Sequence, residues 1–263
     1  MQQVQASSKN IHIWSIPKSG STVLSKAFAC RSDTKSVVEY FLTERNKSGE
    51  RIRDVATRRR DFDFVKSYLD RQSQLYEVTV SKEHGFVYAP WIERGDLEKY
   101  IMTDPRHIIL FREPTAAMKS YQHVLMSAEQ GDIVPELREE EVSFKALKAL
   151  YMHTFPENIL LDFADMVCQP QVFLSGLCKR LGISDESEKM SCWGQRTTEI
   201  DHVLRDPNNS IWFETLRRSG GIDQSYVNDR STVFLPDDMQ EIVENNKVIY
   251  DFFVERKDVL VKQ

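Results

Sequence analysis

Four short apolar runs alternate with longer amphipathic segments along this chain, and this alternation is its most constraining feature. The runs are rich in Ile, Leu and Val and are not cleanly alternating, as is typical of strands covered on both faces. They occupy residues 11–16, 76–80, 107–111 and 158–163. Helical patterns occupy residues 22–30, 35–45, 57–70, 114–128, 136–153, 170–181 and 237–255. The sequence therefore predicts a three-layer α/β fold, in which helices flank a central parallel sheet.

The chain of 263 residues contains no internal repeat, low-complexity tract or linker rich in Pro, Gly or Ser. We therefore expect a single domain spanning residues 1–263. The formal net charge of −5 does not favour binding to nucleic acid. No stretch approaches the roughly 18 apolar residues that cross a bilayer, and the N-terminal sequence lacks the pattern of a secretion signal. These features predict a cytoplasmic protein that binds neither nucleic acid nor a membrane.

The cysteines give no indication of a metal site. No C-x-x-C pair and no histidine at metal-ligand spacing accompanies them. They are Cys30, Cys168, Cys178 and Cys192. We expect reduced thiols and no bound metal.

The segment SIPKSGST, residues 15–22, follows the first predicted strand and opens the first predicted helix. Ligands of parallel sheets bind beyond the carboxyl ends of the strands, so this turn is a candidate binding site. Gly20 allows the backbone to approach a ligand, and a helix that starts at Ser21 or Thr22 presents amides that favour an anion such as phosphate. The alternative is a plain turn that Pro17 stiffens and Ser21 caps.

Two common nucleotide-binding motifs are absent. The Walker A pattern requires a Gly-Lys pair, which occurs nowhere in the chain, and the dinucleotide fingerprint G-x-G-x-x-G is also missing. The sequence therefore does not support an ordinary ATP or GTP P-loop.

Two other predicted strands are followed by polar side chains. Arg112 comes directly after one strand, and Ser120 follows eight residues later in a helix that Pro114 can begin. A guanidinium fork suits phosphate oxygens, and a helix-borne hydroxyl adds one donor. Lys82 and His84 come at the end of another strand. Taken alone, each of these four is more often a surface or hydrogen-bonded residue than a site residue.

Together these stretches resemble the sulfotransferases that use 3′-phosphoadenosine 5′-phosphosulfate (PAPS), whose loop reads roughly Y-P-K-S-G-T-T. The resemblance implies that the loop binds the 5′-phosphosulfate through Pro17, Lys18, Ser19, Gly20, Ser21 and Thr22. It assigns Lys18 to the bridging and 5′-phosphate oxygens. It assigns Arg112 and Ser120 to the 3′-phosphate. The stretch KEH resembles the K-T-H or K-D-H of the family, which makes His84 the base that takes the acceptor's proton.

The resemblance extends more weakly along the rest of the chain. Phe163 falls where the family has a tyrosine that stacks on adenine, and a phenyl ring keeps the stacking face without the hydroxyl. The stretch ETLRRSGGID resembles the family's R-K-G segment, which closes over the 3′-phosphate through residues matching Arg217 and Arg218. Those two arginines can equally form a solvated helix end.

The implied activity is transfer of the sulfuryl group of PAPS to a hydroxyl or amine of a small-molecule acceptor, with release of 3′-phosphoadenosine 5′-phosphate (PAP). The family needs no metal for this step, and its fold is similar to that of P-loop proteins. Two alternatives remain open: a P-loop-like kinase that uses ATP on a small molecule, and a non-catalytic member of the family that binds nucleotide.

Overall fold

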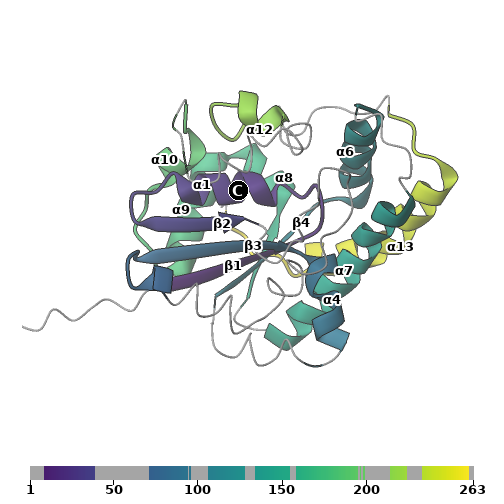
Figure 1. The fold of residues 1–263 in the computed structure, drawn as a ribbon, viewed down its shortest axis with the longest axis horizontal. Helices are drawn as coiled ribbons and strands as arrows, with labels where there is room; N and C mark the ends of the chain where they lie inside the picture. The colour runs from purple at the N-terminus through teal and green to yellow at the C-terminus, as the bar shows by residue number, and fades with distance from the viewer. Residues whose placement is uncertain are drawn as a thin grey trace, which may run out of the picture.

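A computed structural model describes residues 9–38, 71–93, 95, 106–127, 134–154, 158–194, 196, 198, 214–223 and 233–260. Within these residues, one sheet contains five parallel strands in the order β2-β3-β1-β4-β5 (Figure 1). The strands are β1 (Lys9–Ser15), β2 (Thr34–Val38), β3 (Val78–His84), β4 (His107–Phe111) and β5 (Ile159–Asp162). The prediction of an α/β fold with a central parallel sheet is confirmed.

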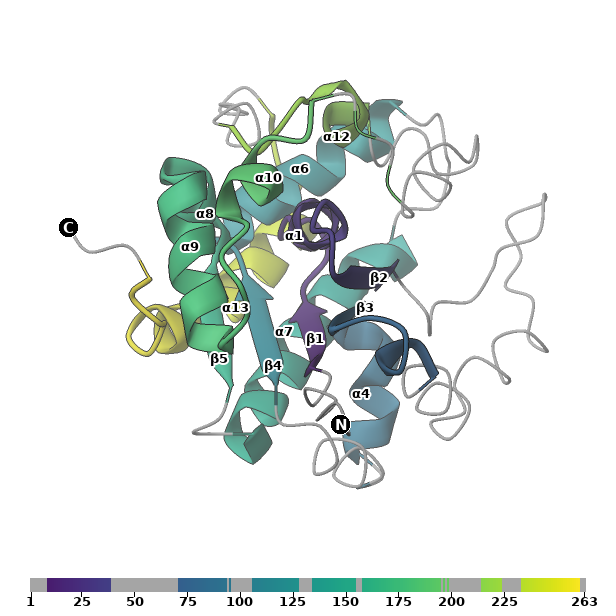
Figure 2. The same cartoon turned by 90° about the vertical axis from the view of Figure 1, so that its left-hand side faces the viewer.

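Helices cover both faces of the sheet. They are α1 (Ser21–Ala29), α4 (Gly85–Glu93), α6 (Pro114–Ser127), α7 (Val134–Thr154), α8 (Phe163–Cys168), α9 (Pro170–Leu181), α10 (Ser187–Ser191), α12 (Glu214–Arg218) and α13 (Asp237–Val254). Figures 1 and 2 show α1, α9 and α10 on one side of the sheet and α4, α7 and α13 on the other. The long helices match the predicted segments closely, and α12 ends at Arg217 and Arg218, where the sequence offered a helix end as one alternative. The sequence pattern did not indicate α4, α8 or α10.

The alternation of side chains along β1 divides the core into two layers. Ile11 and Ile13 lie in the cluster that contains α1 and α9, through residues such as Leu24 and Leu177. Trp14 and Ile16 point to the opposite face, where they lie with residues of α4, α7 and α13. Both faces of the central strand are therefore buried, which explains its nearly continuous apolar sequence.

The predicted helix over residues 35–45 is wrong for its described part. Thr34–Val38 form β2, which pairs in parallel with β3. The β-branched residues of this segment suit a strand, and pairing satisfies its backbone polar groups. Residues 39–45, and all of the predicted helix over residues 57–70, lie outside the described residues.

The bounds of three strands also differ from the prediction, and β1 spans Lys9–Ser15 where residues 11–16 were predicted. β3 begins at Val78 and continues to His84, so Lys82 and His84 belong to the strand itself and not to the turn after it. β5 ends at Asp162, and Phe163 is already the first residue of α8. The side chain of Asp162 caps this helix by accepting a hydrogen bond of 3.0 Å from the Ala164 amide.

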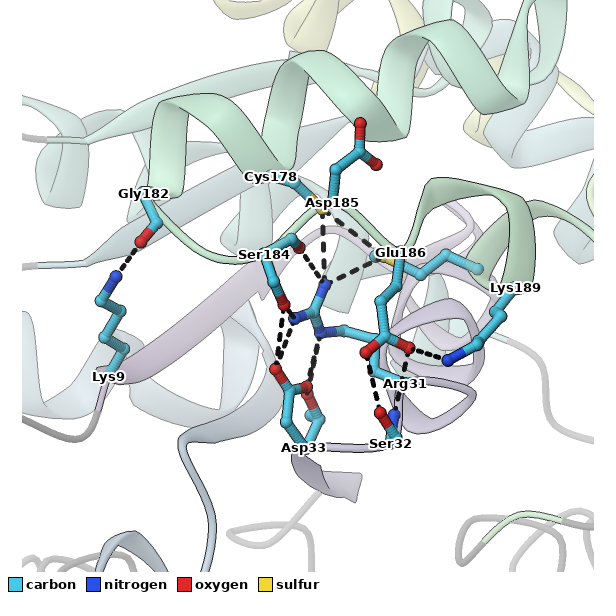
Figure 3. A network of polar contacts seen from close by, with 12 residues as sticks. Lys9, Arg31, Ser32, Asp33, Cys178, Gly182, Ser184, Asp185, Glu186 and Lys189 are labelled. Atoms are coloured by element: carbon cyan, nitrogen blue, oxygen red, sulfur yellow. Dashed lines mark hydrogen bonds and ion pairs between the residues drawn. The ribbon is translucent and has the colours of Figure 1, made fainter. Parts of the chain in front are cut away.

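A buried arginine fastens the carboxyl end of α1 (Figure 3). The Arg31 guanidinium donates to both carboxylate oxygens of Asp33, at 2.9 and 2.7 Å, and to the carbonyl and hydroxyl oxygens of Ser184. Beside it, Glu186 accepts hydrogen bonds of 2.8 Å from the Ser32 hydroxyl and from Lys189. This network ties the end of α1 and the start of β2 to the segment between α9 and α10. The network therefore fixes the carboxyl end of α1, which is opposite the end that the loop after β1 opens.

The hydrogen bonds of this network lower the pKa of Asp33 and keep its carboxyl charged. Burial raises the pKa of the Asp33 carboxyl, but hydrogen bonds from Arg31 and Thr34, together with the Arg31 charge, outweigh burial and hold the pKa below its ordinary value. The ion pair therefore persists at neutral pH.

Among the described residues, no helix has both the length and the apolar character needed to span a bilayer.

Candidate active site

The loop between β1 and α1 has a backbone shape that opens amides toward one side. Lys18 has a φ of 57° and Gly20 a φ of 81°, so two residues of this short loop adopt the left-handed conformation. α1 begins at Ser21, with Gly20 at its N-cap position. The first amides of a helix have no partner within the helix and lie at its positive end. The loop is thus shaped to receive an anion.

Some side chains of the loop are buried and others are half-buried. Ser19 is fully buried, and its hydroxyl donates a hydrogen bond of 2.8 Å to the Ile16 carbonyl, which closes the turn. Pro17 and Ser21 are also buried. Lys18 and Thr22 are half-buried. The residues that the sequence assigned to anion binding therefore lie together, but the Ser19 hydroxyl contributes to the shape of the loop.

Gly20 lies directly against the ring of Phe163. A Cβ at Gly20 would be 2.1 Å from Cε2 and 2.3 Å from Cδ2 of that ring. Phe163 is only 2% exposed and belongs to the core layer of α1 and α9. The structure thus places Phe163 under the loop, in contact with its glycine, and the proposed stacking on adenine stays a prediction.

Arg112 connects three segments of the site. Its Nη1 donates a hydrogen bond of 3.0 Å to the Lys18 carbonyl. Its guanidinium carbon lies 4.6 Å from the centroid of the Phe163 ring, within the range of a cation–π contact. The half-buried arginine at the end of β4 is therefore held beside the loop that follows β1 and the first residue of α8.

Ser120 lies on α6, which begins two residues after Arg112. The predicted start at Pro114 is confirmed, and Ser120 comes about 9 Å along the helix axis from it. The Glu113 carboxylate caps the helix, since it accepts hydrogen bonds of 3.0 and 2.7 Å from the amides of Thr115 and Ala116. Ser120 itself is 9% exposed. Its proposed contact with a 3′-phosphate stays a prediction.

His84 is held between two side chains at the end of β3. It lies opposite Ser15, the last residue of β1, in the parallel register. Its Nδ1 is 3.1 Å from the Ser15 hydroxyl oxygen, and its Nε2 is 2.8 Å from Lys82 Nζ. The imidazole ring also stacks on Phe86, with centroids 5.7 Å apart. His84 is half-buried, whereas Lys82 and Ser15 are fully buried.

Glu140 is a buried carboxyl that sequence reasoning missed. It lies on α7 and is 2% exposed, and neither of its oxygens has a hydrogen-bond partner among the described residues. Burial raises the pKa of Glu140 to about 8; the Arg112 charge opposes this rise and the Glu113 charge adds to it. The group is thus largely uncharged at neutral pH, and it does not neutralise the Arg112 guanidinium.

The position of Glu140 follows from topology. α6 and α7 both lie in the connection between the neighbouring parallel strands β4 and β5, and α7 ends at Thr154, shortly before β5 begins at Ile159. Glu140, in the first half of α7, lies close enough to Arg112 and Glu113, just after β4, for their charges to act on its carboxyl. One turn after Glu140, the Ser143 hydroxyl accepts a hydrogen bond of 3.0 Å from the Phe86 amide. The only signal in the sequence is that Glu140 shares a helical stripe with Phe144 and Leu147.

Arg217 and Arg218 are the last residues of α12, and both are exposed. The turn after them is fixed, because the Gly220 carbonyl accepts hydrogen bonds of 2.8 and 2.7 Å from the amides of Trp193 and Gly194. Leu216 packs into the core layer that includes α1. These contacts place α12 above α1 (Figure 1), and the contact of the two arginines with a nucleotide stays a prediction.

Across the parts of the chain that the structure describes, no group of three or more His, Cys, Asp or Glu side chains is arranged to hold a metal ion. The site thus consists of cationic side chains, helix amides, an imidazole and one neutral carboxyl. Such a set can bind a polyanion and accept a proton.

Comparison with known proteins supports the fold. No protein-family model matches the chain, and no curated protein sequence matches it. A sulfotransferase domain from the olefin synthase of Synechococcus PCC 7002 superposes with a TM-score of 0.64 at 18% identity, covering 98% of each chain. A sulfotransferase domain from the curacin biosynthetic pathway gives a TM-score of 0.60 at 20% identity, covering 91% of this chain and 98% of the other. The chain therefore has the P-loop-like α/β fold of these sulfotransferase domains.

Proposed function

We propose that this protein is a sulfotransferase that moves the sulfuryl group of PAPS to a hydroxyl or amine of a small-molecule acceptor. One observation carries the proposal: the anion-binding loop after β1 is joined on one side to His84, through Ser15, and on the other side to Arg112, through the Lys18 carbonyl. The residues that we propose as the base and as the phosphate-binding cation thus flank the same loop. The fold shared with solved sulfotransferase domains supports the same conclusion.

The donor would bind as a polyanionic nucleotide, with its two ends on neighbouring strands. The amides at the start of α1 and the Lys18 ammonium would receive the 5′-phosphosulfate. Arg112 and Ser120 would hold the 3′-phosphate, since a guanidinium fork and a hydroxyl both donate to phosphate oxygens. β1 and β4 are paired, so both groups belong to one edge of the sheet.

The chemical step would be an in-line transfer at sulfur. The acceptor oxygen or nitrogen forms a bond to sulfur while the bond from sulfur to the bridging oxygen of the 5′-phosphate breaks. The acceptor's proton passes to Nε2 of His84, and the departing phosphate oxygen keeps the electron pair of the broken bond. By analogy with phosphoryl transfer, positioning and charge stabilisation supply most of the rate. Lys18 would stabilise the charge that develops on the leaving oxygen.

A first experiment compares nucleotides by thermal unfolding of the full chain. PAP at about 100 times its Kd adds about 2.7 kcal/mol to the free energy of unfolding, which raises the Tm by several degrees. ATP with Mg²⁺ serves as the competitor that a kinase would bind. A shift with PAP and none with ATP supports the proposal, and the reverse pattern supports a small-molecule kinase.

A second experiment tests transfer itself. The protein is incubated with PAPS labelled in its sulfuryl group and a panel of alcohols, phenols and amines, and labelled products are identified by mass. The Lys18→Ala variant should form product at least about 100-fold more slowly than wild type, whereas Lys179→Ala, which removes an exposed lysine on α9, should behave as wild type. A protein that binds PAP but transfers the label to none of these acceptors, nor to any component of a cell extract, would be a non-catalytic nucleotide-binding protein.

A further inference from the structure

With Lys82 as an ammonium ion, the contacts of 2.8 and 3.1 Å at His84 fit an imidazole protonated on Nδ1. A lysine ammonium donates and cannot accept, so the contact of 2.8 Å with Lys82 requires a lone pair on Nε2 of His84. A neutral imidazole with a lone pair on Nε2 carries its proton on Nδ1. That proton points to the Ser15 oxygen at 3.1 Å, which must therefore accept.

The Ser15 hydroxyl has a separate acceptor for its own proton. Its oxygen lies 3.2 Å from the Glu83 carbonyl, to which it donates. In the series Lys82, His84, Ser15 and the Glu83 carbonyl, each group then donates a hydrogen bond to the next one. A cationic imidazolium would break it, because both ring nitrogens would then be donors.

We propose that Ser15 is a positioning residue that acts together with Lys82: it accepts the Nδ1 proton of His84 and so stabilises the tautomer in which Nε2 is the atom that takes the acceptor's proton. This inference rests on the proposed function for its catalytic consequence, but the tautomer can be measured without turnover. Ser15 is fully buried at the end of β1 and is fixed by the sheet, which makes it a rigid partner. The acceptor hydroxyl would take the place of the Lys82 ammonium at Nε2.

The same pair of strands contains a matched control. His12 of β1 and Ser81 of β3 are also register partners, and His12 Nδ1 lies 2.6 Å from the Ser81 hydroxyl oxygen. Both residues are 2% exposed. Their side chains lie on the face of the sheet to which Trp14 points, whereas Ser15 points to the opposite face, as Ile13 does. Ser81→Ala thus removes an equivalent bond between the same strands without changing the surroundings of His84.

The test is a two-bond ¹H–¹⁵N correlation spectrum of the protein labelled in its histidine rings, with His84 assigned by the loss of its signals in His84→Gln. The wild-type protein should show His84 protonated on Nδ1. Ser15→Ala removes the acceptor of the Nδ1 proton and should shift the ratio of the two tautomers towards protonation on Nε2, although Lys82 still favours a lone pair there. Ser15→Thr, which keeps the hydroxyl, and Ser81→Ala should retain the wild-type ratio. A wild-type His84 protonated on Nε2, or an unchanged tautomer ratio in Ser15→Ala, would overturn the inference.

Turnover provides the second measurement. Ser15→Ala should lower kcat at least about 10-fold, and by less than the 10²- to 10⁴-fold that a whole general base contributes. Its affinity for PAP should stay within about twofold of wild type, and Ser15→Thr should recover most of the rate. An unchanged kcat in Ser15→Ala would contradict the positioning role. Should the wild-type protein show the expected tautomer but no sulfuryl transfer, the proposed function fails while the assignment of Ser15 is supported.

Discussion

The ring of Phe163 occupies the space that a side chain at Gly20 would need. The first residue of α8 and the N-cap of α1 are thereby in van der Waals contact, and the Arg112 guanidinium lies over the same ring. The loop that opens α1 therefore depends on a residue that follows the fifth strand of the sheet. Its conformation is a property of tertiary packing as well as of local sequence.

Gly20→Ala should destabilise the protein more than an ordinary glycine substitution. The new Cβ would be 2.1 Å from the Phe163 ring, and φ would be 81°. The backbone strain is of order 1–2 kcal/mol, and the overlap with a buried ring adds to it. The matched control is Gly95→Ala, where φ is 71° but no atom of the described residues lies within 4 Å of the added Cβ. Equal losses of Tm in the two variants would show that Phe163 does not constrain the loop.

Arg112→Ala should weaken the binding of PAP. A hydrogen bond to a charged group contributes about 1.5–3 kcal/mol, which corresponds to roughly a 10- to 150-fold higher Kd by titration calorimetry. Arg112→Lys should recover only part of the affinity, since an ammonium cannot make the bidentate contact. Arg180→Ala, at an exposed position on α9, should bind PAP as wild type does. Unchanged affinity in Arg112→Ala would remove this arginine from the nucleotide site.

Lys18→Ala and His84→Ala should each lower turnover by at least about 100-fold, because one lacks the charge that stabilises the leaving phosphate and the other lacks the base. The Lys18 side chain is only half-buried, so the Tm of Lys18→Ala should change little. His84→Ala also removes a hydrogen-bond partner of the buried Lys82 and Ser15 and should lower the Tm without abolishing the folded state. Steady-state rates with labelled PAPS and circular dichroism melting provide the two measurements. Near-normal turnover in His84→Ala would show that the histidine is not the base.

The buried carboxyl of Glu140 should make stability depend on pH. Its pKa is about 8 in the folded protein and 4.5 in an unperturbed chain, so the folded state holds a proton that the unfolded state releases between these values. The free energy of unfolding should therefore fall as pH rises from about 5 to 8, by up to a few kcal/mol.

Glu140→Gln should flatten this dependence, because a neutral amide replaces a group that must stay protonated when buried. Denaturant melts at pH 5, 7 and 9 measure the effect. Glu141→Gln, which removes a surface pair with Lys145, should keep the wild-type slope. The same slope in Glu140→Gln and wild type would show that Glu140 is not the titrating group.

The features that the sequence predicted correctly depend on local contacts. The turn at residues 15–22 is recognisable because the strand, the glycine and the helix start are contiguous, and its internal bond joins Ser19 to Ile16. The bounds of α9 were predicted as they are observed, since Pro170 at its first turn and Gly182 in the left-handed conformation at its end are local signals.

The features that were missed depend on partners distant in sequence. β2 is a strand because it pairs with β3, and its five residues are too few to show a periodicity that separates a strand from a helix. Glu140 differs from Glu139 and Glu141 only in the face of α7 that it occupies. The role of Ser15 requires the register between β1 and β3, which no single segment encodes.

The central claim is that the loop after β1 and the end of β4 bind the two ends of one nucleotide. A crystal structure of the protein with PAP tests it most directly. We predict the 5′-phosphate at hydrogen-bond distance from Lys18 and the first amides of α1, and the 3′-phosphate on Arg112 and Ser120. PAP bound elsewhere on the protein, with both turns unoccupied, would contradict the account.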